Sequence, residues 1–184
     1  ARLTSTWDNA ATQEAFMFVN AIVADPSNAD RIYAATRKGL RVSTNGGSSW
    51  SNPIAGLDSV AQDVAVASDG TVIASIDNIA YLSTDGTTFV KKSEVDGATL
   101  GLINEAANTT RLKFAFAPSD PNYIYCVAVG LGTNSQLENI YQSKDKGESW
   151  AVIGPGGSSD FQPYGTYGNY NIALAVDPSN PEFI

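Results

Sequence analysis

The chain has no histidine, and it has one cysteine and one methionine among its 184 residues. Without histidine it lacks the most common general base and zinc ligand, and it cannot form a Ser–His–Asp or Cys–His catalytic group. The single thiol, Cys126, excludes an internal disulfide and any metal site built from several cysteines. Cys126 stands in the apolar run YIYCVAV, which predicts a buried side chain. We therefore expect neither a metal nor a cofactor.

Basic residues are also scarce, because 11 Lys and Arg stand against 19 Asp and Glu, for a net charge of −8. Nucleic-acid binding needs clustered Lys and Arg that displace counterions from phosphates, so this balance argues against a nucleic-acid partner. No apolar run approaches the roughly 18 residues of a membrane-spanning helix. With a hydrophobic fraction of 43%, the composition predicts a soluble globular domain.

What the sequence does have is internal repetition. The segment NAIVADPSNADRIYAAT (20–36) matches KFAFAPSDPNYIYCVAV (113–129) and IALAVDPSNPEFI (172–184). A weaker copy, DVAVASDGTVIASID (63–77), lies between the first two. A second motif follows the complete copies, and we call its three occurrences the box segments: STNGGSSW (43–50), STDGTTF (83–89) and SKDKGESW (143–150). Together the two motifs define a unit of roughly 40–60 residues.

Each unit alternates apolar residues over short stretches between turn signals such as DPSN, SDG and NGG. This pattern predicts antiparallel strands, in the first unit at 19–25, 31–37, 39–44 and about 49–55. A four-strand motif repeated at this interval is typical of β-propeller blades. A β-sandwich is the rival fold, but sandwiches do not repeat one four-strand motif.

We therefore predict an all-β chain with about three complete blades, partial blades at both ends, and the rest of a larger propeller elsewhere. The predicted division is strand D and a D–A loop (1–18), blades (19–58, 59–95 and 111–155), a connection (96–110), an aromatic loop (156–170) and the first strands of a next blade (171–184).

The box segments resemble the Asp-box, or BNR repeat, with the pattern Ser-x-Asp-x-Gly-x-Ser/Thr-Trp/Phe. Such boxes occur in sialidases, sortilin-type receptors, xyloglucanase-like glycoside hydrolases and photosystem II assembly factors. The matching positions are Ser143, Asp145, Gly147, Ser149 and Trp150, then Ser43, Asn45, Gly47, Ser49 and Trp50, and in a copy one residue shorter Ser83, Asp85, Gly86, Thr88 and Phe89. The resemblance implies a propeller whose boxes lie away from the functional face.

The residue types of a box favour a structural turn over a catalytic or calcium site. A short carboxylate or amide can accept hydrogen bonds from the N–H groups of its own turn. Calcium loops need several carboxylates at alternate positions, whereas Lys144 and Lys146 flank Asp145.

Candidate functional residues therefore lie elsewhere. The loop GPGGSSDFQPYGTYGNY (154–170) places four aromatics among Gly, Ser and Pro, a pattern that suits sugar stacking or a protein contact: Phe161, Tyr164, Tyr167 and Tyr170. Catalytic aspartates of a xyloglucanase-like enzyme have candidates by count only, without a motif: Asp63, Asp77, Asp96 and Asp160.

From these observations we expect a non-catalytic, secreted or cell-surface binding and scaffold module for a protein or a glycan. The resemblance extends to large secreted bacterial surface proteins, including type IX secretion cargo. The alternative is a xyloglucanase-like or sialidase-like glycoside hydrolase whose catalytic residues lie outside this segment. A role akin to the photosystem II assembly factors is disfavoured, because nothing in the sequence resembles their Arg-rich patch.

Overall fold

The computed structural model describes residues 3–7, 9–93, 109–130, 135–154, 163, 165, 167, 168 and 170–184. The chain opens with a 3-10 turn, η1 (Thr4–Thr6), and a short helix, α1 (Ala10–Ala15). Strands make up the rest of the regular structure: β1 (Val19–Asp25), β2 (Asn28–Thr36), β3 (Gly39–Ser43), β4 (Ala61–Val66), β5 (Val72–Ile76), β6 (Ile79–Ser83), β7 (Val90–Lys91), β8 (Thr109–Ala117), β9 (Asp120–Gly130), β10 (Leu137–Ser143) and β11 (Ala151–Val152).

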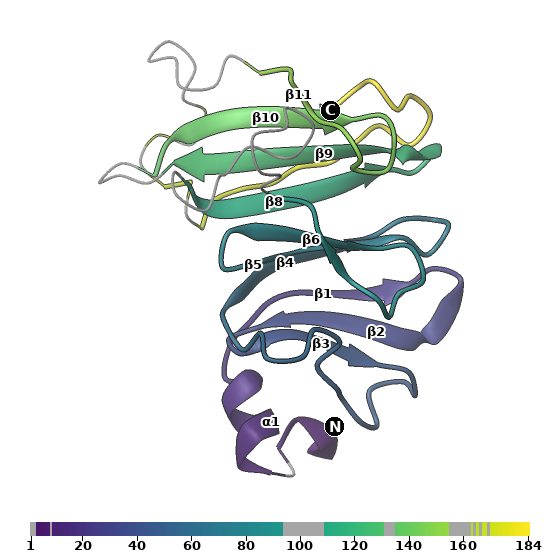
Figure 1. The fold of residues 1–184 in the computed structure, drawn as a ribbon, viewed down its shortest axis with the longest axis vertical. Coiled ribbons are helices and arrows are strands. Elements are labelled where there is room, and N and C mark those ends of the chain that lie inside the picture. The colour runs from purple at the N-terminus through teal and green to yellow at the C-terminus, as the bar shows by residue number, and fades with distance from the viewer. Residues whose placement is uncertain are drawn as a thin grey trace.

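The strands form three antiparallel sheets, which stack one on another along the long axis of the molecule (Figure 1). Blade 1 has the order β1-β2-β3, blade 2 the order β4-β5-β6-β7, and blade 3 the order β8-β9-β10-β11. In blade 1 the fourth strand is reduced to one bridge between Val42 and Ser51. Each sheet is thus a meander of chain neighbours, as the repeats predicted.

The first strand of each blade lies at the inside of the stack. Strands β1 and β4 contact each other, and so do β4 and β8. A register shift interrupts the pairing of β1 at Asn20 and that of β4 at Gln62, at equivalent positions. Such bulges bend a strand and increase its twist. At the first of them the Asn20 side chain reaches blade 2 and donates to the carbonyl of Ala61, over 2.8 Å.

Two apolar layers fill the spaces between the blades. Blades 1 and 2 meet around Tyr33, Leu40 and Val64, and blades 2 and 3 meet around Leu82 and Phe114. Strand β5 is buried at every position, because a blade covers each of its faces, and its sequence VIASI is accordingly almost wholly apolar. Cys126 is a fully buried thiol in the second layer.

Blade 2 is also locked to blade 1 by one close approach at a glycine. Gly86 has a φ of +74°, and a Cβ there would lie 2.4 Å from the Tyr33 hydroxyl and 2.6 Å from the Arg31 guanidinium. The Tyr33 hydroxyl donates to the Gly86 carbonyl over 3.1 Å. A glycine is required because the conformation and the space both exclude a side chain.

Some predicted elements differ from those observed. The strand expected at 49–55 is reduced to the bridge at Ser51, because Pro53 has no N–H to donate and the Asn52 side chain caps a turn at Ile54 instead. Residues 171–184 carry no assigned strand, yet Leu174 and Val176 pack against blade 3. The loop predicted within 1–18 holds η1 and α1, while the strand expected at its start falls partly on residues outside the described ones.

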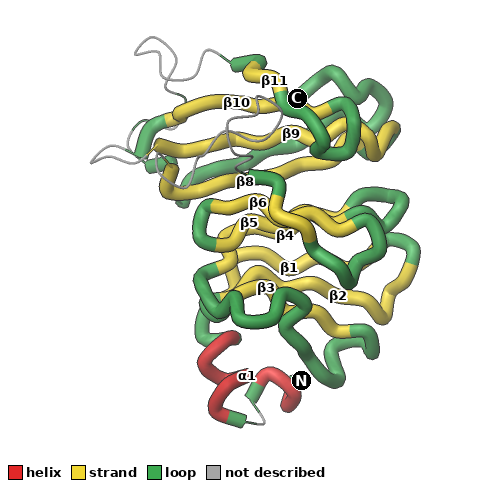
Figure 2. Tube along the Cα trace, in the orientation of Figure 1, coloured by secondary structure: helices red, strands yellow, loops and turns green. Residues whose placement is uncertain are grey.

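A meander of this kind divides the molecule into two ends. The box end carries two kinds of connection. One is the turn between the first and second strands of a blade, and the other is the box segment, which joins the third strand to the fourth. At the loop end lie the turns between the second and third strands, α1, and residues 167, 168 and 170. In the tube drawing, the loops lie at both sides of the stacked strands and the helix lies below them (Figure 2). Neither helix of the described residues is long and apolar enough to cross a membrane.

Candidate functional site

The third box segment is a turn held by its own side chains. The Ser143 hydroxyl donates to Asp145 Oδ1 over 2.8 Å and accepts from the N–H of Gly147 over 2.8 Å. Asp145 Oδ1 also accepts from the N–H of Ser149 over 2.9 Å, while its other oxygen accepts from the Ser149 hydroxyl. Gly147 has a φ of +80°, the left-handed conformation that glycine adopts without strain. Both oxygens of Asp145 are therefore engaged within its own turn.

The first box segment makes the same bonds with an amide in place of the carboxylate. Asn45 Oδ1 accepts from the Ser43 hydroxyl over 3.0 Å and from the N–H of Ser49 over 2.8 Å. Asn45 Nδ2 donates to the Ser49 hydroxyl over 2.8 Å. In the second box segment, which is one residue shorter, Asp85 Oδ1 accepts from the N–H groups of Thr87 and Thr88, each over 2.7 Å. A formal charge is not needed for the turn to form.

These hydrogen bonds set the ionisation of the two carboxylates. For Asp85, the N–H groups of Thr88 and Thr87 and the Ser83 hydroxyl hold the pKa well below its usual value. For Asp145, partial desolvation acts to raise the pKa, but the bonds from Ser149 and Ser143 together outweigh it and leave the pKa lowered. Both side chains are therefore ionised near neutral pH, as acceptors of hydrogen bonds and not as proton donors.

The aromatic residues that close the box segments anchor them to the apolar layers. Trp150 packs against the layer between blades 2 and 3, and its indole N–H donates to the carbonyl of Gly147 over 3.2 Å. Phe89 packs against the layer between blades 1 and 2. Trp50 meets the ring of Phe16 edge to face, with 4.9 Å between centroids.

Ion pairs tie the turns of the box end to one another. Lys146 binds Asp69 of blade 2 over 2.6 Å, and Lys144 binds Glu182 over 2.6 Å. The two lysines that flank Asp145 in the sequence thus bridge neighbouring units. They leave Asp145 itself to the turn.

The loop end carries the two described members of the predicted aromatic set. Tyr167 and Tyr170 are 55% and 65% exposed, and their rings lie 5.8 Å apart at an interplanar angle of 56°. The N–H of Tyr170 donates to the carbonyl of Tyr167, and the N–H of Gly168 to that of Ser135, over 3.2 and 3.0 Å. The pair is thus fixed to Ser135, just before β10. Phe161 and Tyr164 lie outside the described residues.

Of the four candidate aspartates, Asp63 occupies a special position. It is fully buried on β4, where Oδ1 lies 2.6 Å from the Lys113 amine and Oδ2 accepts from the N–H of Phe114 over 2.8 Å. The pair joins the inner strands of blades 2 and 3. Asp77 is exposed in the turn between β5 and β6, with a φ of +53°. Asp96 and Asp160 lie outside the described residues.

Sequence reasoning missed Lys113 and Asn20, which carry the polar contacts between inner strands. Both residues precede or interrupt apolar runs. A polar residue in an otherwise apolar inner strand needs a hydrogen-bonding partner, and this is the signal that could have identified them. Their partners, 50 and 41 residues away, have no signature in the sequence.

Comparison with known proteins identifies the architecture. No family model and no curated protein matches the chain. Among solved structures, an ancestral GH74 enzyme matches with a TM-score of 0.55 and 20% identity, over 74% of this chain and 18% of that one. The GH74 xyloglucanase from Xanthomonas campestris matches with a TM-score of 0.53 and 18% identity, over 74% of this chain and 21% of that one. YCF48 from Cyanidioschyzon merolae matches with a TM-score of 0.51 and 14% identity, over 76% of this chain and 37% of that one.

The chain is built from β-propeller blades. The predicted fold class is thereby confirmed, with antiparallel blades in an almost entirely β-stranded molecule. Sequence identities this low support a shared fold and not a shared function, because one propeller architecture serves unrelated functions. The chain spans only 18 to 37% of the length of the three structures it matches.

Proposed function

We propose that this chain is part of a secreted or cell-surface Asp-box β-propeller, and that it acts as a non-catalytic binding and scaffold module for a protein or a carbohydrate. The observation that carries the proposal is the exposed pair Tyr167 and Tyr170 at the loop end. The box end, in contrast, has its side chains engaged in turns and ion pairs. The binding surface is therefore the loop end.

The tyrosine pair has the properties of a recognition surface. Each ring offers a flat apolar face and a hydroxyl with little conformational entropy to lose. Burying such rings on binding accounts for their enrichment at protein interfaces, and the same faces stack on sugar rings. Their anchoring to Ser135 and to each other keeps both rings exposed, as a preorganised contact requires.

The carboxylates of the described residues support a non-catalytic module. An inverting glycosidase needs an acid and a base that face each other across a water-filled cleft, about 6.5–9.5 Å apart. Asp63, on an inner strand, is fully buried and bound to Lys113, so it faces no substrate. The fold likeness to GH74 enzymes is what supports the alternative, a glycoside hydrolase with its catalytic residues elsewhere in the protein.

The secreted setting is supported by the box segments and by the composition. Their pattern resembles that of sortilin-type receptors, and the repeated units resemble those of large secreted bacterial surface proteins such as type IX secretion cargo. The net charge of −8 and the single buried thiol suit an extracellular protein that stays soluble without disulfides.

The direct test compares binding and hydrolysis by the intact protein. A glycan array and a pull-down from the native surface fraction identify the ligand, and isothermal titration then measures the effect of Tyr167→Ala and Tyr170→Ala. We expect each variant to weaken binding at least about fivefold, while Tyr123→Ala at the box end leaves it unchanged. Release of reducing sugar from xyloglucan that is lost in one Asp→Ala variant would replace the proposal with the hydrolase alternative.

A further inference from the structure

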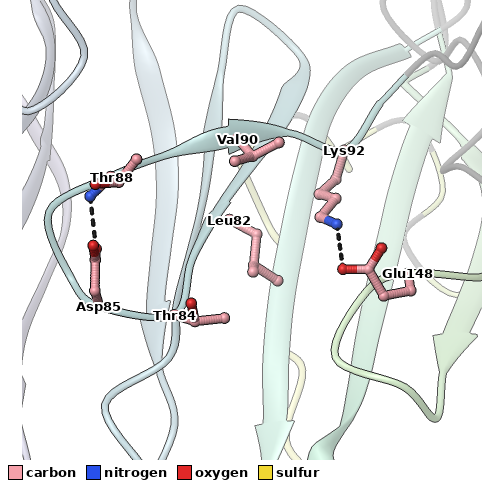
Figure 3. A pocket seen from close by; sticks show the side chains of 7 residues that line it. All are labelled: Leu82, Thr84, Asp85, Thr88, Val90, Lys92 and Glu148. Atoms are coloured by element: carbon pink, nitrogen blue, oxygen red, sulfur yellow. Dashed lines mark hydrogen bonds and ion pairs between the residues drawn. The ribbon is translucent and has the colours of Figure 1, made fainter.

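A second candidate site lies at the opposite end of the molecule from the tyrosine pair. A surface pocket of about 330 Å³ opens where the box segment of blade 2 meets that of blade 3 (Figure 3). We call it the rim pocket, and its lining includes Leu82, Asp85, Thr88, Val90, Lys92 and Glu148. Figure 3 shows Asp85 and Thr88 on one side, Lys92 and Glu148 on the other, and the two apolar side chains between them.

The middle of the pocket is apolar and rigid. Leu82 is only 3% exposed and belongs to the layer between blades 2 and 3. Val90 stands opposite Leu82 in the pairing of β6 with β7 and is 57% exposed. These two side chains provide a surface for an aliphatic chain to cover, and burying Val90 removes apolar area from water.

The polar groups of the pocket carry a net negative charge. Lys92 Nζ lies 2.6 Å from Glu148 Oε1, so this cation is already neutralised. The carboxylate of Asp85 has no ion pair of its own among the described residues, and hydrogen bonds from its turn hold it ionised. The neighbouring guanidinium of Arg31 donates to the backbone carbonyl of Asp85 over 3.3 Å and lies 3.7 Å from the carboxylate of Asp25. The side chain of Lys91 is directed away from the pocket, because alternate residues of a strand face opposite sides of the sheet. The pocket therefore attracts a cation and repels phosphates and carboxylates.

The size and lining of the pocket narrow the ligand further. Its volume is at the lower limit of small-molecule sites, and it contains no aromatic ring on which a sugar could stack. An aliphatic floor between two polar walls matches a long side chain with a cationic head. In addition, β7 is the last strand of its sheet within the described residues, so its outer backbone groups face away from the blade. An extended chain can pair with such an edge.

We propose that the rim pocket binds an arginine side chain from an extended segment of a partner protein. The stem covers Leu82 and Val90, and the guanidinium meets the carboxylate of Asp85 on one wall of the pocket, while the Lys92–Glu148 pair forms the other wall. Arginine fits better than lysine, because its planar fork donates to two acceptors at once and is less strongly hydrated. This site is independent of the tyrosine pair, and it gives the molecule a second contact surface at the box end.

The test uses the full chain and a fluorescein-labelled five-residue peptide with a central arginine between valines, followed by fluorescence polarisation. We expect saturable binding that weakens as salt rises, and about tenfold weaker binding of the same peptide with glutamine at the centre. Asp85→Asn reduces affinity for the arginine peptide by a similar factor, and Glu148→Gln also weakens binding because it leaves the charge of Lys92 unpaired in the pocket. Asp85→Asn keeps the turn, since Asn45 fills the same place in the first box segment.

The control variant is Glu182→Gln, which removes an equal charge from the Lys144 pair outside the pocket. It leaves binding unchanged, as do Tyr167→Ala and Tyr170→Ala. Three results would overturn the proposal: equal binding of the arginine and glutamine peptides, unchanged affinity in both pocket variants with melting temperature preserved, or displacement of the labelled peptide by a xyloglucan oligosaccharide. The tyrosine variants test the loop-end surface and the Asp85 and Glu148 variants test the rim pocket. A negative result at one site therefore leaves the proposal for the other site standing.

Discussion

The two ends of the blades use their side chains in opposite ways. At the box end, Asp145, Ser143 and Ser149 satisfy one another within a single turn, and Lys146 reaches the neighbouring blade. At the loop end, Tyr167 and Tyr170 are anchored by backbone bonds while their side chains remain exposed. A polar cluster that closes on itself stabilises the fold, whereas side chains held open by their backbone are available to a ligand.

This contrast separates repetition from function. The box segments recur in three units because every blade must close the same turn between its third and fourth strands. The loop 154–170 has no counterpart with the same aromatics in the other units. Residues that repeat report the architecture, and residues that break the repeat are where a propeller module acquires a specific partner. The rim pocket adds one qualification, because two repeated turns together create a surface that neither has alone.

The largest expected effect tests whether the box end is structural. Trp150→Ala removes a ring that packs against the layer between blades 2 and 3, together with its bond to Gly147. We expect a loss of about 3–4 kcal/mol in the free energy of unfolding, measured by urea denaturation. Trp50→Ala is the matched control and costs less, because within the described residues the Trp50 indole N–H has no hydrogen-bond partner. If Trp150→Ala weakened ligand binding but left the free energy of unfolding unchanged, the box end would have a binding role and not a structural one.

The next effect concerns the inner strands near the loop end. Asp63→Ala leaves the Lys113 amine without its carboxylate and the N–H of Phe114 without an acceptor. Breaking a buried pair from one side costs about 3 kcal/mol here, since Lys113 is 26% exposed and regains some hydration. Thermal unfolding monitored by circular dichroism measures the loss. If Asp63→Ala instead abolished an enzymatic activity in a fully stable protein, Asp63 would belong to a catalytic site.

How far the sequence predicts this molecule follows from the range of each interaction. The β1 strand at 19–25 was predictable, because a local pattern of apolar and turn residues determines it. The helix α1 was missed, although Asn9 and Thr12 form a capping box that signals its start. The Asp63–Lys113 pair and the rim pocket were not predictable, since each depends on how two blades pack and not on either segment alone.

A smaller effect tests the comparison between an amide and a carboxylate in the box. The pKa of Asp145 is lowered in the folded state, so the carboxylate stabilises the fold above the unfolded pKa of about 4, and this contribution is lost as pH falls through the folded pKa. Asp145→Asn should lower stability at pH 7 by no more than about 1 kcal/mol, because the group is exposed and screened.

The difference between wild type and Asp145→Asn should then shrink between pH 5 and pH 2, as melting curves at several pH values will show. Asn45→Asp is the matched reverse variant, and it should introduce additional acid sensitivity into the first box segment. A difference that stays constant across this range would mean that the charge of Asp145 contributes nothing to folding.

The smallest expected change in stability is at the loop end, and it tests the contrast from the other side. Tyr170→Ala removes a ring that is 65% exposed and touches only Tyr167 among the aromatic rings of the described residues. We expect a change within about 0.5 kcal/mol by urea denaturation, because little buried area is lost. A loss as large as that of Trp150→Ala would show that the tyrosines cap the blade. An unchanged melting curve with weakened ligand binding is the combination that only an exposed recognition residue produces.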